Sequence, residues 1–307
     1  MTSHTAFLPT DPILSIESPG MQYKPTEPVA CKVLVNERIT PADYSEDVRH
    51  LVLDLSHLRY DYVEGQSVGI LAPGIGENGK PHKVRLYSIA SPAIGEPGYG
   101  QSMALTIKRV VYEHHESLVR GICSNYLCDL HIGDTVMISG PSGKNFNLPS
   151  DQTTDLILFA TGTGIAPYRS FLMNLSSRPN RYEGDIHLFF GSRKLIDQLY
   201  DTELNDDLRR YSQGLKLHIH AALSREIPGQ KMYVTDILQK EKEAIESVLS
   251  RRNFAVYICG LKGMEKGIEA FVRSYLEHQS GQTINDTEWF HSKHSLRKLG
   301  RWSQEVY

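Results

Sequence analysis

Two short motifs in the first half of the chain combine a cation, an aromatic ring and backbone N–H groups. In the motif RLYS at residues 85–88, strand periodicity predicts that Arg85 and Tyr87 lie on one face. A guanidinium beside an aromatic ring suits a ligand with a phosphate at one end and a planar ring at the other. Taken alone, the pair is more typical of a surface arginine beside a half-buried strand tyrosine.

The second motif is GICSN at residues 121–125, where a glycine precedes a Ser/Asn N-cap that is expected to open a short helix. Such a helix start presents free N–H groups and a positive dipole end, which together bind anions. Many helices begin this way with nothing bound. Combined with Arg85 and Tyr87, however, the motif predicts a site for the pyrophosphate of a dinucleotide or a flavin.

In the second half, the motif TGTGIAP at residues 161–167 follows an apolar run and precedes a helix-length segment. A strand, a glycine-rich turn and a helix N-terminus form the arrangement that holds a pyrophosphate. Pro167 stands where the full dinucleotide fingerprint has its third glycine, and proline suits the first turn of a helix.

The residues after the next two predicted strands indicate which dinucleotide would bind. The acidic ribose ligand typical of NAD sites is missing at residues 190–193, where the sequence reads FGSR. A hydroxyl, two cations and an aromatic ring follow the third strand, and they suit a 2′-phosphate and an adenine. We therefore expect NADP rather than NAD, the alternative being an ordinary polar loop. The four residues are Ser224, Arg225, Lys231 and Tyr233.

No metal site is expected. Cys31, Cys123, Cys128 and Cys259 are too sparse for a disulfide framework or a zinc site, and Cys123 and Cys128 supply only the first spacing of a plant-type iron–sulfur cluster. Adjacent side chains in EHHE at residues 113–116 point in different directions, as is typical of a solvated hairpin tip. The cofactor of an electron carrier with this sequence would therefore be organic.

The elements that must position these motifs change character near residue 150. Residues 29–149 show strands without sustained helical periodicity, which predicts a closed antiparallel β-barrel. Residues 150–307 alternate apolar strands with helix-length segments, which predicts an α/β domain with a parallel sheet. Residues 1–28 are expected to form a flexible arm. The expected strands are 30–35, 48–55, 67–71, 83–90, 103–111, 118–121, 135–139, 156–160, 186–190, 215–221 and 254–259.

Length and charge agree with this two-domain reading. The 307 residues suffice for two domains of roughly 150 residues each. The 33 lysines and arginines against 36 aspartates and glutamates leave a net charge of −3, which argues against nucleic acid as a partner. No stretch approaches the ~18 apolar residues of a transmembrane helix. Because the first 28 residues resemble neither a signal nor a transit peptide, we expect a cytoplasmic protein, or alternatively a mature protein of the plastid stroma.

Together these motifs resemble plant-type, plastidic-like ferredoxin–NADP reductase. Their order and spacing agree from about Tyr23 to the last residue, and the ending EVY at residues 305–307 is typical of the plastidic-like branch. The resemblance implies an FAD-binding barrel joined to an NADP(H)-binding α/β domain, with electrons passing between NADPH and ferredoxin. Hydride would be exchanged between nicotinamide C4 and flavin N5. A flavin is required because nicotinamide moves two electrons at once and an iron–sulfur protein moves one.

The resemblance also implies roles for individual residues. Arg85 would hold the FAD pyrophosphate, Tyr87 would stack on the isoalloxazine and Ser88 would reach its N5 edge. Ser88, Cys259, Glu305 and Tyr307 would be the catalytic residues, with Tyr307 on the flavin face that the nicotinamide must occupy. Lys108 and Tyr112 match residues at the FAD adenosine end, and Ser124 matches the pyrophosphate N-cap. The remaining expected cofactor-binding residues are Gly121, Ile122, Cys123, Thr161, Gly162, Gly164, Pro167, Ser224, Arg225, Lys231 and Tyr233.

Two other functions stay open at this point. The same fold and chemistry would serve another acceptor, such as an oxygenase component or a flavodoxin. A redox-dead binding or scaffold protein is the other alternative, although such a protein would not need Ser88, Cys259, Glu305 and Tyr307. Lys80 and Lys83 match basic positions of the family's docking surface for ferredoxin.

Overall fold

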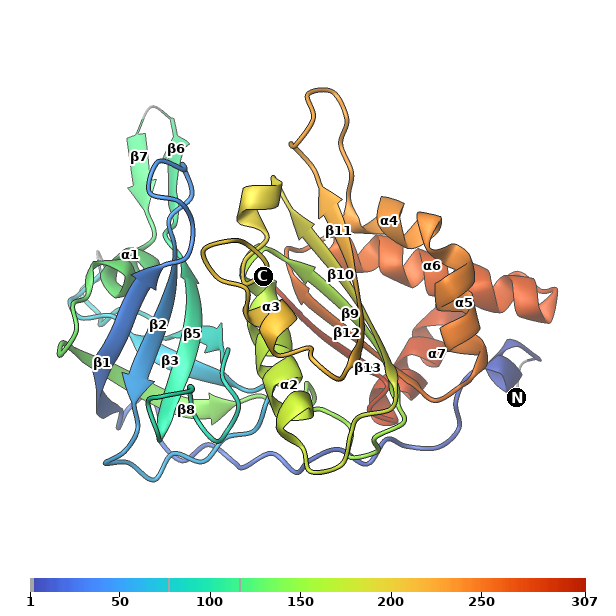
Figure 1. The fold of residues 1–307 in the computed structure, drawn as a ribbon, viewed down its shortest axis with the longest axis horizontal. Helices are drawn as coiled ribbons and strands as arrows, with labels where there is room; N and C mark the ends of the chain where they lie inside the picture. The colour runs from blue at the N-terminus through green and yellow to red at the C-terminus, as the bar shows by residue number, and fades with distance from the viewer. Residues whose placement is uncertain (1–2, 77, 116) are drawn as a thin grey trace.

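A computed structural model of the chain describes residues 3–76, 78–115 and 117–307. In the first half, alternating side chains build the strands: in β1 (Val29–Arg38), Cys31, Val33 and Val35 point into the core. The strands form a six-stranded antiparallel sheet in the order β4-β3-β8-β1-β2-β5 (Figure 1). An isolated bridge between Ile89, just after β4, and Leu105 of β5 joins the outer strands, so the predicted barrel is confirmed. The other strands are β2 (Val48–Asp54), β3 (Ser67–Leu71), β4 (Arg85–Ser88), β5 (Ser102–Lys108) and β8 (Thr135–Ser142).

One expected strand, 103–111, is split in the structure. It ends as β5 at Lys108, and the chain continues into a separate hairpin of β6 (Val111–His114) and β7 (Ser117–Arg120), which projects from the barrel (Figure 1). Most described side chains of this hairpin are exposed. Because they do not pack in the barrel core, β5 ends before the hairpin begins. The EHHE segment lies at its tip, where Glu116 is outside the described residues. The helix α1 (Ile122–Asp129) follows the hairpin.

The second half forms a five-stranded parallel sheet in the order β11-β10-β9-β12-β13. Four of its strands were expected from their apolar runs. The fifth, β13, was not, because WSQEV mixes polar and apolar residues and becomes a strand only by pairing with β12. The strands are β9 (Asp155–Thr161), β10 (Asp185–Ser192), β11 (Lys216–Leu223), β12 (Phe254–Gly260) and β13 (Trp302–Val306).

Helices cover both faces of this sheet (Figure 1). The side chains of β9 belong to a different hydrophobic cluster on each face. Ile157 and Phe159 belong to a hydrophobic cluster shared with α4, α5, α6 and α7, whereas Leu156 and Leu158 belong to one shared with α2. Among the described residues, no helix is both long and apolar enough to cross a membrane. The helical segments are η1 (Ser3–Phe7), η2 (Gly162–Ile165), α2 (Ala166–Ser177), η3 (Leu195–Asp197), α3 (Asp207–Arg210), α4 (Val234–Lys240), α5 (Lys242–Ser250), α6 (Met264–Ser280) and α7 (Asp286–Lys298).

The amino-terminal arm differs from the flexible segment expected from its composition. Its described part runs along both domains (Figure 1), with Leu8 buried in the core and His4 hydrogen-bonded to Ser292 through Nε2 and Oγ at 3.2 Å. The physical reason is that its few apolar side chains find uncovered core surface in the distant α/β domain. Backbone bonds hold the arm further along, from Ile13 to Leu299, Ile16 to Leu148 and Tyr23 to Gly140.

A buried ion network joins the two halves of the molecule. Arg169 of α2, which is 2% exposed, donates to Glu96 of the first half and to Asp207 of the second at 2.6 and 2.7 Å. Its Nη1 also donates to the carbonyl of Ala90 at 2.8 Å. Because these partners come from both halves, the network links the barrel to the α/β domain.

Candidate active site

The start of α1 and the strand β4 meet at the surface of the barrel. Arg85 is exposed on β4, and Tyr87 is half-buried with its hydroxyl in contact with the thiol of Cys123 in α1. Burial raises the pKa of Tyr87, so its hydroxyl stays protonated. The fold therefore brings together the two motifs that predicted a pyrophosphate site.

The N-cap of α1 is Gly121 and not Ser124, which corrects the sequence expectation. Ser124 instead lies inside the first turn, where its Oγ accepts from the N–H of Val110 at 3.2 Å and donates to the carbonyl of Gly121 at 3.3 Å. A Cβ at Gly121 would lie 2.7 Å from Ser124 Oγ and 2.9 Å from Val110 Cβ, so only glycine fits. The first N–H groups of the helix, including those of Ile122 and Cys123, have no partner within the helix itself.

Tyr112 completes this side of the barrel. It is 52% exposed on β6, and the hairpin base meets the start of α1 through a bond from Gly121 N to the carbonyl of Val110 at 2.9 Å. Arg85, Tyr87 and the start of α1 thus lie together, and the hairpin that carries Tyr112 leads directly into α1. The donor set fits a ligand with a pyrophosphate between two planar groups, as FAD has.

A second cluster forms where the barrel meets the α/β domain. Cys259 of β12 and Glu305 of β13 are register partners in the parallel sheet, and the hydroxyl of Ser88 on β4 lies within hydrogen-bonding reach of both side chains. Cys259 is 1% exposed, and burial together with the neighbouring Glu305 raises the pKa of its thiol. Burial also raises the pKa of Glu305 to about 7, against a hydrogen bond from Ser88 that lowers it. The cluster therefore holds a buried, neutral thiol beside a carboxyl that titrates near neutral pH.

The carboxyl-terminal residue Tyr307 is tied to the glycine-rich turn. Its hydroxyl bonds with Thr163 Oγ1 at 2.8 Å, and its N–H donates to the carbonyl of Gly260 at 3.0 Å. The ring is 58% exposed, close enough to Cys259 for an electrostatic interaction. The chain end thus lies at the junction of the two domains (Figure 1).

The glycine-rich turn is shaped by close contact with the end of β12. A Cβ at Gly164 would lie 2.2 Å from the carbonyl oxygen of Cys259, whereas Gly162 adopts a φ of 54° in open space. Thr161 Oγ1 accepts the N–H of Leu261 at 2.8 Å, which ties β9 to β12. Pro167 stands in the first turn of α2, as its position in the motif predicted.

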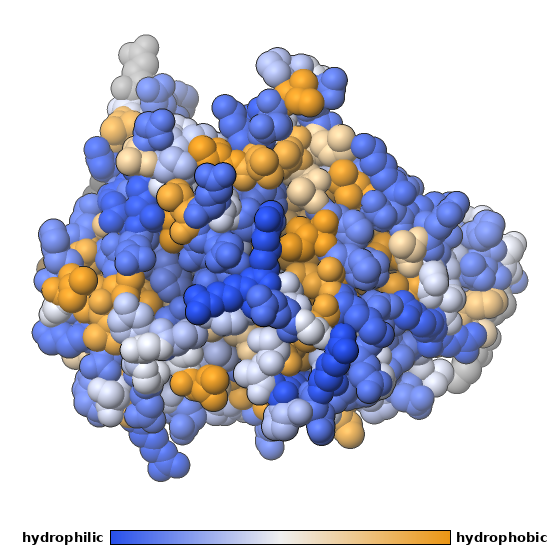
Figure 2. Space-filling model, viewed as in Figure 1, coloured by the Kyte–Doolittle hydropathy of each residue, from blue (hydrophilic) through white to orange (hydrophobic). Residues whose placement is uncertain are grey.

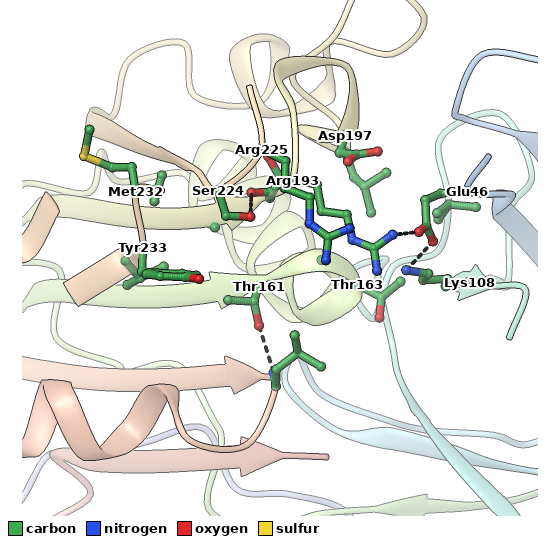
Figure 3. Close-up of a pocket in the computed structure, with 18 of the residues that line it drawn as sticks. Glu46, Lys108, Thr161, Thr163, Arg193, Asp197, Ser224, Arg225, Met232 and Tyr233 are labelled. Atoms are coloured by element: carbon green, nitrogen blue, oxygen red, sulfur yellow. Dashed lines mark hydrogen bonds and ion pairs between the residues drawn. The ribbon is translucent and has the colours of Figure 1, made fainter. Parts of the chain in front are cut away.

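A pocket of about 440 Å³ opens beside this turn, between the carboxyl ends of the strands and the barrel (Figure 3). Ser224, Arg225, Lys231 and Tyr233 all line it, as the sequence predicted for one ligand site. Ser224 and Arg225 are held at the ends of β10 and β11 by backbone hydrogen bonds. The N–H of Ser224 donates to the carbonyl of Ser192 at 3.0 Å, and the N–H of Arg225 donates to the carbonyl of Arg193 at 2.7 Å. The cations, hydroxyl and exposed ring fit a phosphorylated adenosine.

Lys108 lies in this pocket and not where the sequence predicted it. Two further residues of the pocket, Glu46 and Arg193, were not predicted from the sequence. Lys108 was expected at the adenosine end of FAD, but it lines this pocket at the end of β5 and is ion-paired with Glu46. Glu46 also pairs with Arg193 of the second domain (Figure 3). Arg193 could have been found from its place at the carboxyl end of a parallel strand. Glu46 gives no such signal, because it lies in a barrel loop.

Comparisons with known proteins agree with both halves of this site. Residues 37–146 match the family described as oxidoreductase FAD-binding domain, and residues 158–270 match oxidoreductase NAD-binding domain. The chain is 39% identical over 293 residues to a chloroplastic leaf ferredoxin–NADP reductase of Oryza sativa subsp. indica, covering 93% of this chain and 78% of the relative. It is 37% identical to a ferredoxin–NADP reductase of Spirulina sp, covering 93% and 97%.

Solved structures give the same result. The ferredoxin–NADP+ reductase of Plasmodium falciparum, solved with 2′P-AMP, superposes with a TM-score of 0.72 at 25% identity, covering 96% of this chain and 100% of that one. A mutant of the same protein, also solved with 2′P-AMP, gives a TM-score of 0.72 and covers 94% and 99%. Both halves of the present chain therefore align with the solved two-domain reductase.

Proposed function

The chain belongs to the ferredoxin–NADP reductases, and we propose that its two residue clusters and its pocket divide the family's reaction among them. The protein is an FAD-dependent oxidoreductase that transfers electrons between NADP(H) and ferredoxin. The observation that carries the residue assignment is the meeting of Ser88, Cys259 and Glu305 from two domains at one point. The division of the chain into an FAD-binding unit at 29–149 and an NADP-binding unit at 150–307 belongs to the same proposal.

The barrel surface holds the flavin in this proposal. Arg85 and the first N–H groups of α1 bind the pyrophosphate, Tyr87 packs against the ring system and Tyr112 packs against the adenine. When bound, FAD supplies the exchange between two-electron transfer with a nicotinamide and one-electron transfer with an iron–sulfur protein. The Tyr87–Cys123 contact joins β4 to α1, so the ring site and the phosphate site lie side by side.

The cluster of Ser88, Cys259 and Glu305 lies where the two cofactors must meet. Cys259 excludes water because it is almost fully buried and its thiol stays neutral. Glu305, whose pKa is raised to about 7, holds a proton on its carboxyl at the lower end of the neutral range and releases it above. The hydroxyl of Ser88, on the barrel strand β4, is the hydrogen-bond partner of the Glu305 carboxyl. Tyr307, held by Thr163, covers this point from the solvent side.

The pocket takes the adenosine end of NADP(H). Ser224, Arg225 and Lys231 bind the 2′-phosphate and Tyr233 packs on the adenine, while the turn at residues 161–167 faces the pyrophosphate. Lys108, which lines the same pocket, also binds this cofactor and not FAD.

The partner and the location are proposed at a finer level than the comparisons reach. Ferredoxin is the partner expected of the family, with a flavodoxin as the alternative, and we place its contact near the exposed Lys80 and Lys83. Hydrophilic side chains cover most of the face shown in Figure 2, and hydrophobic ones form separate patches. We propose the cytoplasm as the location; the rice relative is named chloroplastic.

The test is anaerobic reduction of the FAD-loaded protein by NADPH, followed by addition of ferredoxin. NADPH should bleach the flavin absorbance, and oxidised ferredoxin should restore it at a rate that falls with ionic strength because the contact is electrostatic. Restoration by a flavodoxin but not by ferredoxin would favour the alternative acceptor. A folded protein that takes up no FAD would refute the proposal.

A further inference from the structure

Two acidic side chains, Glu46 and Asp197, line the pocket beside its cations, and Glu46 is the one that is ion-paired with two of them. The carboxylate of Glu46 forms ion pairs with Lys108 of its own domain and with Arg193 of the other, as the dashed lines in Figure 3 show. Glu46 is 15% exposed, whereas Lys108 and Arg193 are 40% and 43% exposed. The carboxylate therefore lies deeper than the two cations, on the barrel side of the pocket.

The loop that carries Glu46 is held in place by contacts other than the two ion pairs of its carboxylate. Thr40 Oγ1 donates to the carbonyl of Glu46 at 2.6 Å, and Arg38 Nη2 donates to it at 3.3 Å. Two residues earlier, the hydroxyl of Tyr44 donates to Asp197 of the second domain at 2.6 Å. The carboxylate of Glu46 is thus presented to the pocket by a fixed backbone.

This placement puts Glu46 in competition with any phosphate that enters. An arginine holds a phosphate through a fork of two parallel N–H bonds, and Nη1 of Arg193 is already engaged by Glu46. Lys108 is engaged in the same way. A phosphate must either displace the carboxylate from these cations or share them with it, and it meets the negative charge of Glu46 in both cases.

We propose that Glu46 is a specificity-determining residue that lowers the affinity of the pocket for the 2′-phosphate of adenosine nucleotides by competing for Arg193 and Lys108. The proposal rests on the proposed function of the pocket. The competition costs affinity for phosphorylated ligands and leaves the adenosine contacts at Tyr233 untouched. It also couples the ligand to the domain junction, because the Glu46–Arg193 pair joins the two domains.

The experiment is calorimetric titration of the FAD-loaded protein with 2′-AMP and with adenosine. E46Q keeps the shape of the side chain and removes its charge. We expect 2′-AMP to bind about threefold to fivefold more tightly to E46Q, the range expected when one partly exposed carboxylate no longer competes. Adenosine should bind with unchanged affinity. E243Q removes the same charge from the exposed face of α5, outside the pocket, and should bind both ligands like the wild type.

Two further variants separate the possible failures. Adding R193A should shrink the gain caused by E46Q, because one of the contested cations is then absent. R225A reports on the pocket itself and should weaken 2′-AMP binding to the wild type. If R225A weakens binding but E46Q leaves it unchanged or weaker, competition by Glu46 is refuted and the proposed function stands. If R225A and the wild type bind 2′-AMP equally, the pocket assignment fails, and the proposal fails with it.

Discussion

Glu305 is a carboxyl side chain whose pKa lies near neutral pH. Burial raises its pKa from 4.5 to about 7, so between these values the folded protein binds a proton that the unfolded chain releases. The free energy of unfolding therefore receives a contribution that declines as pH rises from 4.5 to 7. Glu305→Gln, which stays neutral, should remove this decline in urea unfolding measured across that range. A variant with the same pH slope as the wild type would show that Glu305 does not titrate there.

Arg225 and Lys231 are the residues on which coenzyme choice should depend. Replacing both with alanine should reduce the preference for NADPH over NADH, mainly by weakening NADPH. Each charge-assisted contact is worth about 1.5 kcal/mol, the lower end of the usual range, because both side chains are exposed. The measurement is kcat/KM for the two coenzymes, with Lys298→Ala on α7 as a control for loss of a surface cation. An unchanged ratio would exclude both residues from recognition of the 2′-phosphate.

At the scale of elements, the glycine-rich turn and β12 approach each other too closely for a larger residue. Gly164→Ala would bring a methyl group within 2.2 Å of the carbonyl oxygen of Cys259, so the turn or the strand must shift. We expect the free energy of unfolding to fall by about 1–3 kcal/mol, the usual cost of overpacking, and NADPH binding to weaken with it. Gly20→Ala is the control, because no atom lies within 4 Å of that Cβ. Equal stability of the two variants would contradict the expected clash.

The two glycines of this turn are required for different reasons, and one of the reasons lies in β12. Gly162 and Gly164 look alike in the motif, yet only Gly164 contacts β12, while Gly162 needs its freedom for a φ of 54°. The requirement at Gly164 comes from a strand almost a hundred residues later, so no local pattern distinguishes the two.

At the scale of the whole molecule, Arg169 holds the two domains together. Its guanidinium is 2% exposed and pairs with Glu96, which is 8% exposed. Arg169→Ala would leave that carboxylate buried without its partner and should lower the free energy of unfolding by about 3–5 kcal/mol. Chemical unfolding followed by flavin fluorescence and by circular dichroism would test this. Arg210→Ala, which removes an exposed cation from α3, provides the control.

Because of the same network, the free energy of unfolding of the wild type depends on pH in the acid range. Burial disfavours the charge of Glu96, but hydrogen bonds from His50 and Arg169 outweigh it and lower its pKa from 4.5 to about 2. The stabilising contribution is therefore complete above pH 4.5 and is lost as pH falls towards 2. Arg169→Ala should unfold with a weaker acid dependence in this range. A wild-type slope in the variant would mean that Glu96 takes its stabilisation from other groups.

The local sequence pattern predicts many of the strands and binding motifs of this protein, because strands, turns and helix starts depend on residues that are neighbours in the chain. The apolar runs predicted β9, β10, β11 and β12, and the motifs at residues 85–88, 121–125 and 161–167 indicated phosphate and ring sites before any contact was known. The family resemblance added the two-domain reductase, which the comparisons confirm.

Contacts between distant segments were decided only by the tertiary structure. WSQEV at residues 302–306 becomes a strand because it pairs with β12. The amino-terminal arm is anchored because Leu8 packs in the hydrophobic core of the α/β domain. Glu46 reaches Arg193 across 147 positions, and Ser88 reaches Glu305 across the domain junction. The sheet order and the docking of the domains set such distances, and both depend on the summed packing of the whole chain, which no single segment encodes.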